Sequence, residues 1–152
     1  MKRLRDIVEG REKTPHELRI RQIATERRED FYGQHHDPNR LAKYGDCGHV
    51  SNHVCDGLKV YYRSARVVDG TYYHHHRTGE DRGELTGDSA DHSWIEIPEI
   101  KHFVDPTHDQ MPTYHKNRKT MIQSKSGLFP DNAIKIGRMN GRNYRKYYKP
   151  DR

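Results

Sequence analysis

The chain has 152 residues, enough for one domain but too few for two domains of ordinary size. Hydrophobic residues make up 31% and charged residues 33%, so only part of the chain can enter a core. No stretch reaches the roughly 18 apolar residues of a membrane span, and the N-terminus lacks the apolar run of a signal peptide. We therefore expect a cytoplasmic protein with no membrane partner. Two cysteines are too few for a disulfide scaffold, which favours a chemical role for them.

Positive charge is concentrated near the C-terminus. From Lys116 to Arg152 there are 11 Lys and Arg residues and 2 acidic residues, a net charge of +9, whereas the first 115 residues carry 17 basic and 20 acidic residues, a net charge of −3. This asymmetry predicts a folded domain over residues 1–115 and a basic, tyrosine-rich, extended arm over 116–152. Such an arm suits nucleic acid, since tyrosines stack on bases and cations contact phosphates. The arm is about equally suited to docking on a protein neighbour in an assembly. The third interpretation is that it is only a solvated tail.

The first predicted element is a helix over residues 14–29. Thr14, Pro15 and Glu17 fit an N-cap, a first helical position and a capping-box partner, and apolar residues follow at helical spacing. The charged outer face of this helix, which includes Arg28, is expected to be solvated. A loop is predicted over residues 30–45.

A second, shorter helix is predicted from near Asp46, with Gly57 as its stop. Beyond it the sequence is rich in β-branched and aromatic residues, which favours antiparallel strands. The Asp69-Gly70 pair is typical of a hairpin turn, and residues 78–90 are expected to form an exposed loop. The predicted strands cover residues 59–62, 66–68, 71–73, 92–97 and 100–105. Helices followed by such strands indicate an α+β fold.

Cys47 lies at the predicted start of the second helix, directly after Gly45 and Asp46. Unpaired backbone N–H groups and the helix dipole at this position favour a thiolate over a thiol, although the charge of Asp46 at the N-cap opposes this in part. The same N–H groups suit the negative oxygen that develops when a thiolate attacks an amide carbonyl. The alternative is that Cys47 is a small buried residue without a chemical role.

The last two predicted strands form a hairpin that brings His92 and Asp105 together. Placing Ile97 opposite Ile100 puts His92 directly opposite Asp105, with β-carbons about 5 Å apart. Pro98 cannot adopt the positive φ of a two-residue hairpin turn, which favours a wider, symmetric loop with the same register. Two favourable cross-strand pairs support this register, Trp94 with Phe103 and Glu96 with Lys101. Side chains of Ile95, Ile97, Ile100 and Val104 then face a core on one side of the sheet, and those of His92, Trp94, Phe103 and Asp105 lie on the other.

Cys47, His92 and Asp105 supply a nucleophile, a base and a carboxylate that orients the base, which are the parts needed for covalent acyl transfer. In this order the sequence resembles the transglutaminase-like and papain-like cysteine peptidase superfamily, and especially small bacterial and phage-encoded members. The resemblance covers residues 45–110 and depends on GDCGH at 45–49, DHSWIE at 91–96 and VDPTHDQ at 104–110.

The resemblance implies that Cys47 attacks a carbonyl, that His92 transfers the proton and that Asp105 fixes the His92 tautomer. It implies an amide substrate on a protein or peptide, and no cofactor or metal. If water resolves the thioester on Cys47, the enzyme is a peptidase or deamidase. If an amine resolves it, the enzyme is a transglutaminase. A phage-encoded member would be carried in a virion. Candidates for a side-chain oxyanion donor are Gln34, Tyr44 and Asn52.

Three alternatives remain open from the sequence. Cys55 is expected to be buried packing instead of a second nucleophile or a disulfide partner. A zinc site is the second alternative, because histidines four apart on a helix chelate a metal; it would use Cys47, His49 or His53 with His74 and His76. His74 and His76 share a strand face, which lines the cleft beside Cys47 or forms a solvated edge. The third is a structural or assembly protein, such as a virion component, that docks through the basic arm.

Overall fold

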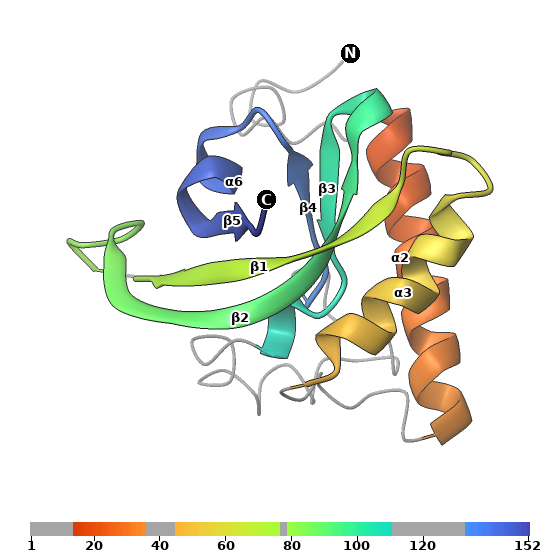
Figure 1. Cartoon of the computed structure of the whole chain (residues 1–152), viewed down its shortest axis with the longest axis horizontal. Helices are drawn as coiled ribbons and strands as arrows, with labels where there is room; N and C mark the ends of the chain where they lie inside the picture. The colour runs from red at the N-terminus through yellow and green to blue at the C-terminus, as the bar shows by residue number, and fades with distance from the viewer. Residues whose placement is uncertain (1–13, 36–44, 77–78, 111–132) are drawn as a thin grey trace, which may run out of the picture.

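The computed structural model describes residues 14–35, 45–76, 79–110 and 133–152, which form an α+β fold with one antiparallel sheet (Figure 1). The predicted α+β class with an antiparallel sheet is confirmed. The sheet has five strands in the order β4-β3-β2-β1-β5. The elements are α2 (Pro15–His35), α3 (Cys47–Leu58), β1 (Arg66–His75), β2 (Leu85–Ile97), η1 (Pro98–Ile100), β3 (His102–Asp105), η2 (His108–Gln110), β4 (Lys135–Arg138), α6 (Arg142–Tyr147) and β5 (Tyr148–Pro150).

Helix α2 begins where the sequence predicts but extends further. The Glu17 backbone N–H donates a hydrogen bond to the Thr14 hydroxyl oxygen at 3.1 Å, which is the predicted N-cap. The helix continues to His35, so the loop predicted over residues 30–45 is wrong for its first six residues. The reason is Tyr32, which is fully buried in the core and requires a helical turn beyond Arg28. Residues 36–44 of the predicted loop lie outside the described residues.

Arg28 is buried, which corrects the prediction that it lies on a solvated face. None of its surface is exposed, and its guanidinium binds both carboxylate oxygens of Asp109, at 2.7 and 2.5 Å. A further hydrogen bond runs from Arg28 Nη1 to the Pro106 carbonyl oxygen at 2.9 Å. Helix α2 is therefore bonded to the segment that follows β3, a contact that helical periodicity does not reveal.

Helix α3 begins at Cys47, as predicted. The two residues predicted to mark its ends, Asp46 and Gly57, have other roles in the structure. Asp46 occupies the N-cap position without a side-chain capping bond, and its carboxylate accepts a hydrogen bond from the Tyr32 hydroxyl at 2.9 Å. Gly57 lies inside the helix and does not stop it. A β-carbon at Gly57 would lie 3.1 Å from Ile23 Cγ2 and 2.7 Å from Arg27 Nε, so this glycine allows α2 to approach α3 closely.

The hairpin predicted at Asp69-Gly70 is wrong, because β1 runs straight through both residues. A β-carbon at Gly70 would lie 2.3 Å from the Lys149 carbonyl oxygen and 2.6 Å from the Trp94 ring. Gly70 is thus required for close approach between β1, Trp94 and β5 and not for a turn. The segment predicted as a strand at 59–62 forms turns instead, and the loop predicted over 78–90 is shorter, because β2 already begins at Leu85.

Gly70→Ala is expected to destabilise the fold by about 1–3 kcal/mol, because the added methyl group has no space between Trp94 and β5. The matched control is Gly48→Ala, since no heavy atom lies within 4 Å of a β-carbon there. This change in α3 should leave stability unchanged or raise it by up to about 1 kcal/mol. Urea unfolding of both variants measures the difference, and equal stabilities would contradict the packing role of Gly70.

Strands β2 and β3 pair two residues away from the predicted register. Ile97 lies opposite His102 and Ile95 opposite Val104, so the predicted pairs of His92 with Asp105, Trp94 with Phe103 and Glu96 with Lys101 are wrong. The 3-10 turn η1 and Lys101, with a left-handed φ of 54°, form a four-residue loop, which is wider than a two-residue turn, as Pro98 indicated, but does not keep the predicted register. Because the difference is an even number of residues, the predicted faces of both strands are preserved.

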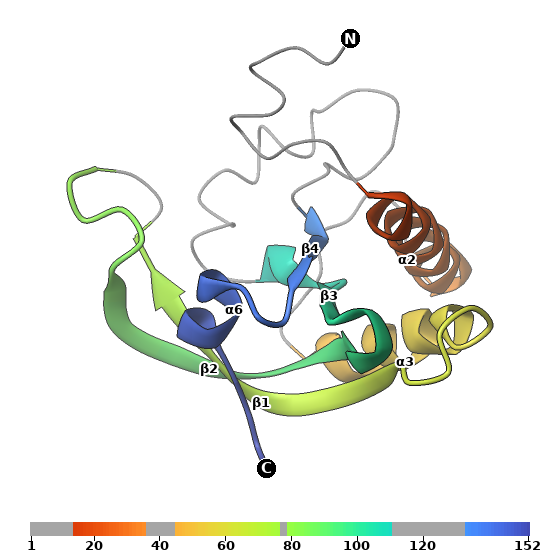
Figure 2. The same ribbon diagram turned by 90° about the horizontal axis from the view of Figure 1, so that it is seen from above.

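The two faces of the sheet pack against different elements (Figure 2). Helices α2 and α3 cover one face, where Ile20, Val54, Leu58, Ile95, Ile97 and Val104 belong to the larger core. Helix α6 lies over the other face, where aromatic residues form a second core. This second core contains Tyr72, Trp94, Phe103, Tyr144, Tyr147 and Tyr148.

The C-terminal stretch is folded over residues 133–152, which corrects the expectation of an extended arm. Strand β5 pairs with β1, with Tyr148 opposite Tyr72, and the Trp94 indole donates a hydrogen bond to the Tyr144 hydroxyl at 2.9 Å. The tyrosines that suggested base stacking are thus buried against the sheet, while residues 116–132 lie outside the described residues. None of the described helices is long and apolar enough to cross a membrane.

Candidate active site

The fold brings Cys47, His92 and Asp105 together from three different elements. Cys47 is the first residue of α3, His92 lies on β2, and Asp105 ends β3. The His92 Nε2 atom lies 2.9 Å from Asp105 Oδ1, and the Cys47 thiol is within hydrogen-bonding reach of His92. The three residues predicted from the sequence therefore share one site, although their catalytic role stays a prediction.

The contact between His92 and Asp105 survives the change of register. Both side chains lie on the aromatic face of the sheet, since an even shift does not exchange the faces. In the observed register they are diagonal neighbours, about 7–8 Å apart at the backbone, instead of directly opposed residues. The imidazole ring spans this distance and reaches the carboxylate through Nε2.

Asp105 is completely buried and accepts hydrogen bonds from several groups besides His92. The Tyr148 hydroxyl donates to Oδ2 at 2.7 Å, and the Thr107 backbone N–H donates to Oδ1 at 3.3 Å. His108 Nδ1 lies 3.5 Å from Oδ2. Burial by itself would raise the pKa of Asp105, but the charge and hydrogen bonds of His92 and His108 hold this pKa well below its usual range. The carboxylate is therefore ionised in the folded protein.

The pKa values of His92 and Cys47 shift in opposite directions. Burial acts to lower the pKa of His92, but the Asp105 carboxylate outweighs it and raises this pKa to about 9. Burial acts to raise the pKa of the Cys47 thiol, but the hydrogen bond and charge of His92 outweigh it and leave this pKa below its ordinary value. These shifts increase the fraction of Cys47 that is a thiolate beside a protonated His92, which is the activated form of a cysteine nucleophile.

Cys47 opens into a cavity of about 400 Å³ between the start of α3 and the middle of β1 and β2. The first intrahelical bond of α3 runs from the Val50 N–H to the Asp46 carbonyl, so the N–H groups of Cys47 and Gly48 have no acceptor within the helix. The helix dipole adds positive potential at the same point. These backbone groups fit an oxyanion site next to the sulfur. The described residues that line the cavity are Gly45, Cys47, Asp69, Gly70, Asp91, His92, Ser93 and Asp151.

The predicted side-chain oxyanion donors are not brought to this cavity by the described part of the chain. Asn52 is exposed, and its amide donates to the Gly48 carbonyl oxygen at 2.9 Å. It lies five residues beyond Cys47, about 140° further round the helix. Tyr44 and the side chain of Gln34 lie outside the described residues.

The structure shows no set of zinc ligands within residues 14–35, 45–76, 79–110 and 133–152. No group of three or more His, Cys, Asp and Glu side chains there is arranged to hold a metal ion. His53 instead pairs with Asp30 at 2.7 Å, which joins α3 to α2. Cys55 is buried in the core, as predicted, and burial raises the pKa of its thiol. His74 is buried beside Tyr72, whereas His76 is exposed and lines a second cavity.

Two residues of the site had no role assigned from the sequence. Tyr148 reaches Asp105 only because β5 pairs with β1, and no local pattern signals that pairing. The Gln110 amide nitrogen lies 3.2 Å from His92 Nδ1, while its oxygen has no hydrogen-bond partner among the described residues. In this orientation the amide donates to a neutral ring, and rotation of the amide presents its oxygen to an imidazolium. Gln110 belongs to the VDPTHDQ segment, which was the available signal.

Comparison with known proteins adds no further assignment: no family model matches the chain, and neither a curated protein nor a solved structure shows a significant similarity to it.

Proposed function

We propose that the protein is a thiol-dependent amide hydrolase or acyltransferase with a transglutaminase-like, papain-like core. The observation that supports this most strongly is the position of His92, which Asp105 holds at 2.9 Å through Nε2 and whose charge and hydrogen bonding lower the pKa of the Cys47 thiol. A nucleophile at a helix N-terminus, next to a base oriented by a buried carboxylate, is the arrangement that covalent acyl transfer requires.

In the first step the Cys47 thiolate attacks the amide carbonyl carbon and a carbon–sulfur bond forms. The negative oxygen of the tetrahedral intermediate is stabilised by the N–H groups at the start of α3. The intermediate collapses when the carbon–nitrogen bond breaks, and the protonated His92 gives its proton to the departing nitrogen. The products are a thioester on Cys47, a free amine and a neutral His92 that stays bonded to Asp105.

In the second step His92 takes a proton from the incoming acceptor, which attacks the thioester carbonyl. Water yields a carboxylic acid, and a primary amine yields a new amide; both release the Cys47 thiolate and restore the imidazolium. Three aspartates, Asp69, Asp91 and Asp151, line the cavity beside Cys47. Their charge favours neutral or cationic groups near the sulfur, such as an amide or an amine, over acidic side chains.

The test offers the protein an unstructured, glutamine-rich protein such as casein together with a fluorescent primary amine. Hydrolysis appears as new amino termini or released ammonia, and transamidation as fluorescence bound to casein. Cys47→Ala is the variant that lacks the nucleophile, and Cys55→Ala is its matched control. We expect product from the unmodified chain and from Cys55→Ala but none from Cys47→Ala. Product that persists without Cys47, or turnover that requires Cys55, would contradict the proposal.

A further inference from the structure

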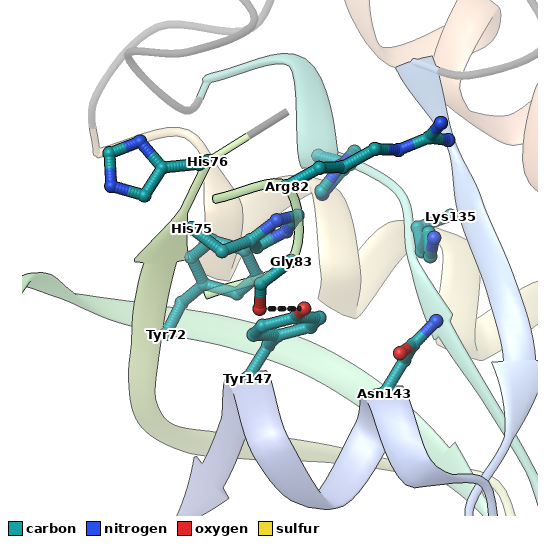
Figure 3. Close-up of a pocket in the computed structure, with 9 residues that line it drawn as sticks. Tyr72, His75, His76, Arg82, Gly83, Lys135, Asn143 and Tyr147 are labelled. Atoms are coloured by element: carbon teal, nitrogen blue, oxygen red, sulfur yellow. Dashed lines mark hydrogen bonds between the residues drawn. The ribbon is translucent and has the colours of Figure 1, made fainter. Parts of the chain in front are cut away.

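A second cavity, of about 480 Å³, lies on the aromatic side of the sheet, between β1, the turn at residues 79–84, β4 and α6 (Figure 3). It shares no described lining residue with the cavity beside Cys47. The described lining residues are Tyr72, His75, His76, Arg82, Gly83, His108, Lys135, Asn143 and Tyr147. Its volume falls in the range of about 300–1,000 Å³ that is usual for small-molecule sites.

The described residues that line this cavity are basic or neutral, whereas three aspartates line the cavity beside Cys47. Arg82 and Lys135 supply two positive charges, three histidines add further N–H donors, and none of the described lining residues is acidic. A cavity with cationic walls attracts anions and disfavours cationic groups. The guanidinium of Arg82 also has the planar, multiple-donor geometry that binds phosphate oxygens in pairs.

The walls of the cavity are held in place by aromatic and backbone contacts. The rings of His75 and Tyr147 are stacked, with centroids 3.9 Å apart and planes inclined by 20°. The Tyr147 hydroxyl donates to the Gly83 carbonyl oxygen at 2.7 Å, which attaches the turn that carries Arg82 to α6. Figure 3 shows Arg82, Lys135 and Asn143 around one side of the hollow, with the Tyr147 and Tyr72 rings along its wall.

We propose that this cavity binds a small ligand that carries phosphate groups attached to a planar ring, as a nucleotide does. The cationic and N–H groups account for the phosphates. A volume much larger than one phosphate, with Tyr72, His75 and Tyr147 along the wall, leaves room for the ring. His108 lines this cavity and also lies 3.5 Å from Asp105 Oδ2, so the ligand would bind next to the buried carboxylate of the candidate triad.

The test measures binding by the full chain, with isothermal titration calorimetry at physiological salt, so it is independent of any activity of Cys47. The probes are adenosine diphosphate, inorganic pyrophosphate and adenosine. We expect adenosine diphosphate to bind and adenosine to bind at least ten times more weakly. Equal affinities for pyrophosphate and adenosine diphosphate would still support the phosphate site but overturn the part assigned to the ring. No binding of either phosphate compound, or equal binding of adenosine, would overturn the whole proposal.

Paired variants separate this site from general attraction to a basic protein. Arg82→Gln with Lys135→Gln should weaken binding of adenosine diphosphate at least tenfold. The control, Arg142→Gln with Arg145→Gln, removes the same charge from exposed positions on α6 that do not line the cavity, and should leave binding within about twofold. Equal weakening by both pairs would overturn the proposal. Arg82→Gln alone, on an exposed side chain, provides a variant whose folding is not at risk.

Discussion

Asp105→Asn is expected to reduce turnover by about 10²- to 10⁴-fold, the range that general acid–base catalysis contributes. Asparagine keeps an oxygen that accepts the hydrogen bond from His92 Nε2 but removes the buried negative charge. That charge is what raises the pKa of His92 to about 9. Without it, burial lowers the pKa of His92, the ring is neutral at pH 7, and Cys47 reverts towards a thiol. The rate of Cys47 alkylation at pH 6.5 should fall together with turnover.

The matched control for this prediction is Asp91→Asn. Asp91 lines the cavity beside Cys47 and the change removes the same charge, but Asp91 is exposed and forms no part of the hydrogen bond to His92. We expect less than a fivefold change in alkylation at pH 6.5, since exposed charges are screened by solvent and salt. If both variants retained the alkylation rate of the unmodified chain, Asp105 would have no part in forming the thiolate.

Arg28→Ala is expected to lower the free energy of unfolding by about 3–5 kcal/mol, the usual cost of leaving one partner of a buried ion pair alone. Neither side chain of the Arg28–Asp109 pair is exposed to solvent. The loss also frees the segment after β3, because Arg28 donates to the Pro106 carbonyl oxygen. Urea unfolding at pH 7 measures the change.

Two further variants show whether the ion pair causes this loss. Arg19→Ala removes an exposed arginine from the same helix and should cost less than about 1 kcal/mol. Arg28→Met combined with Asp109→Leu removes both charges and should recover a large part of the stability lost by Arg28→Ala. A double variant as unstable as the single one would mean that packing of Arg28, not the unpaired Asp109, is responsible.

Features that depend on neighbouring residues could be predicted from the sequence. The Thr14 N-cap, the start of a helix at Cys47 and the alternation of faces along β2 each follow from residues a few positions apart. The grouping of the candidate triad also survived, because faces repeat every two residues and the error in register was two residues. Strand alternation was therefore enough to place His92 and Asp105 on one face of the sheet, and their catalytic role with Cys47 stays a prediction.

Features that depend on distant segments could not be predicted in this way. Gly70 has the local signature of a turn, yet its role is set by Trp94 and by β5 nearly eighty residues later. Arg28 belongs to a highly charged helix, and only the position of Asp109 shows why it is buried. The C-terminal tyrosines have the composition of a binding arm, but Tyr148 completes the hydrogen bonding of Asp105. In each case the residue that explains the contact lies too far along the chain for a local sequence pattern to reveal it.

The pH dependence of Cys47 alkylation by iodoacetamide tests the central claim most directly. Peptide mass spectrometry between pH 4 and 10 follows Cys47 and Cys55 in the same sample, with buried Cys55 as the internal reference. Since the pKa of Cys47 is lowered and that of His92 is raised to about 9, Cys47 should react with a midpoint below the ordinary thiol pKa of about 8.5. It should also react far faster than Cys55 at pH 6.5, with a second change in rate near pH 9 when His92 loses its proton. A single midpoint at or above 8.5, or equal rates for both cysteines, would contradict a thiolate–imidazolium pair at this site.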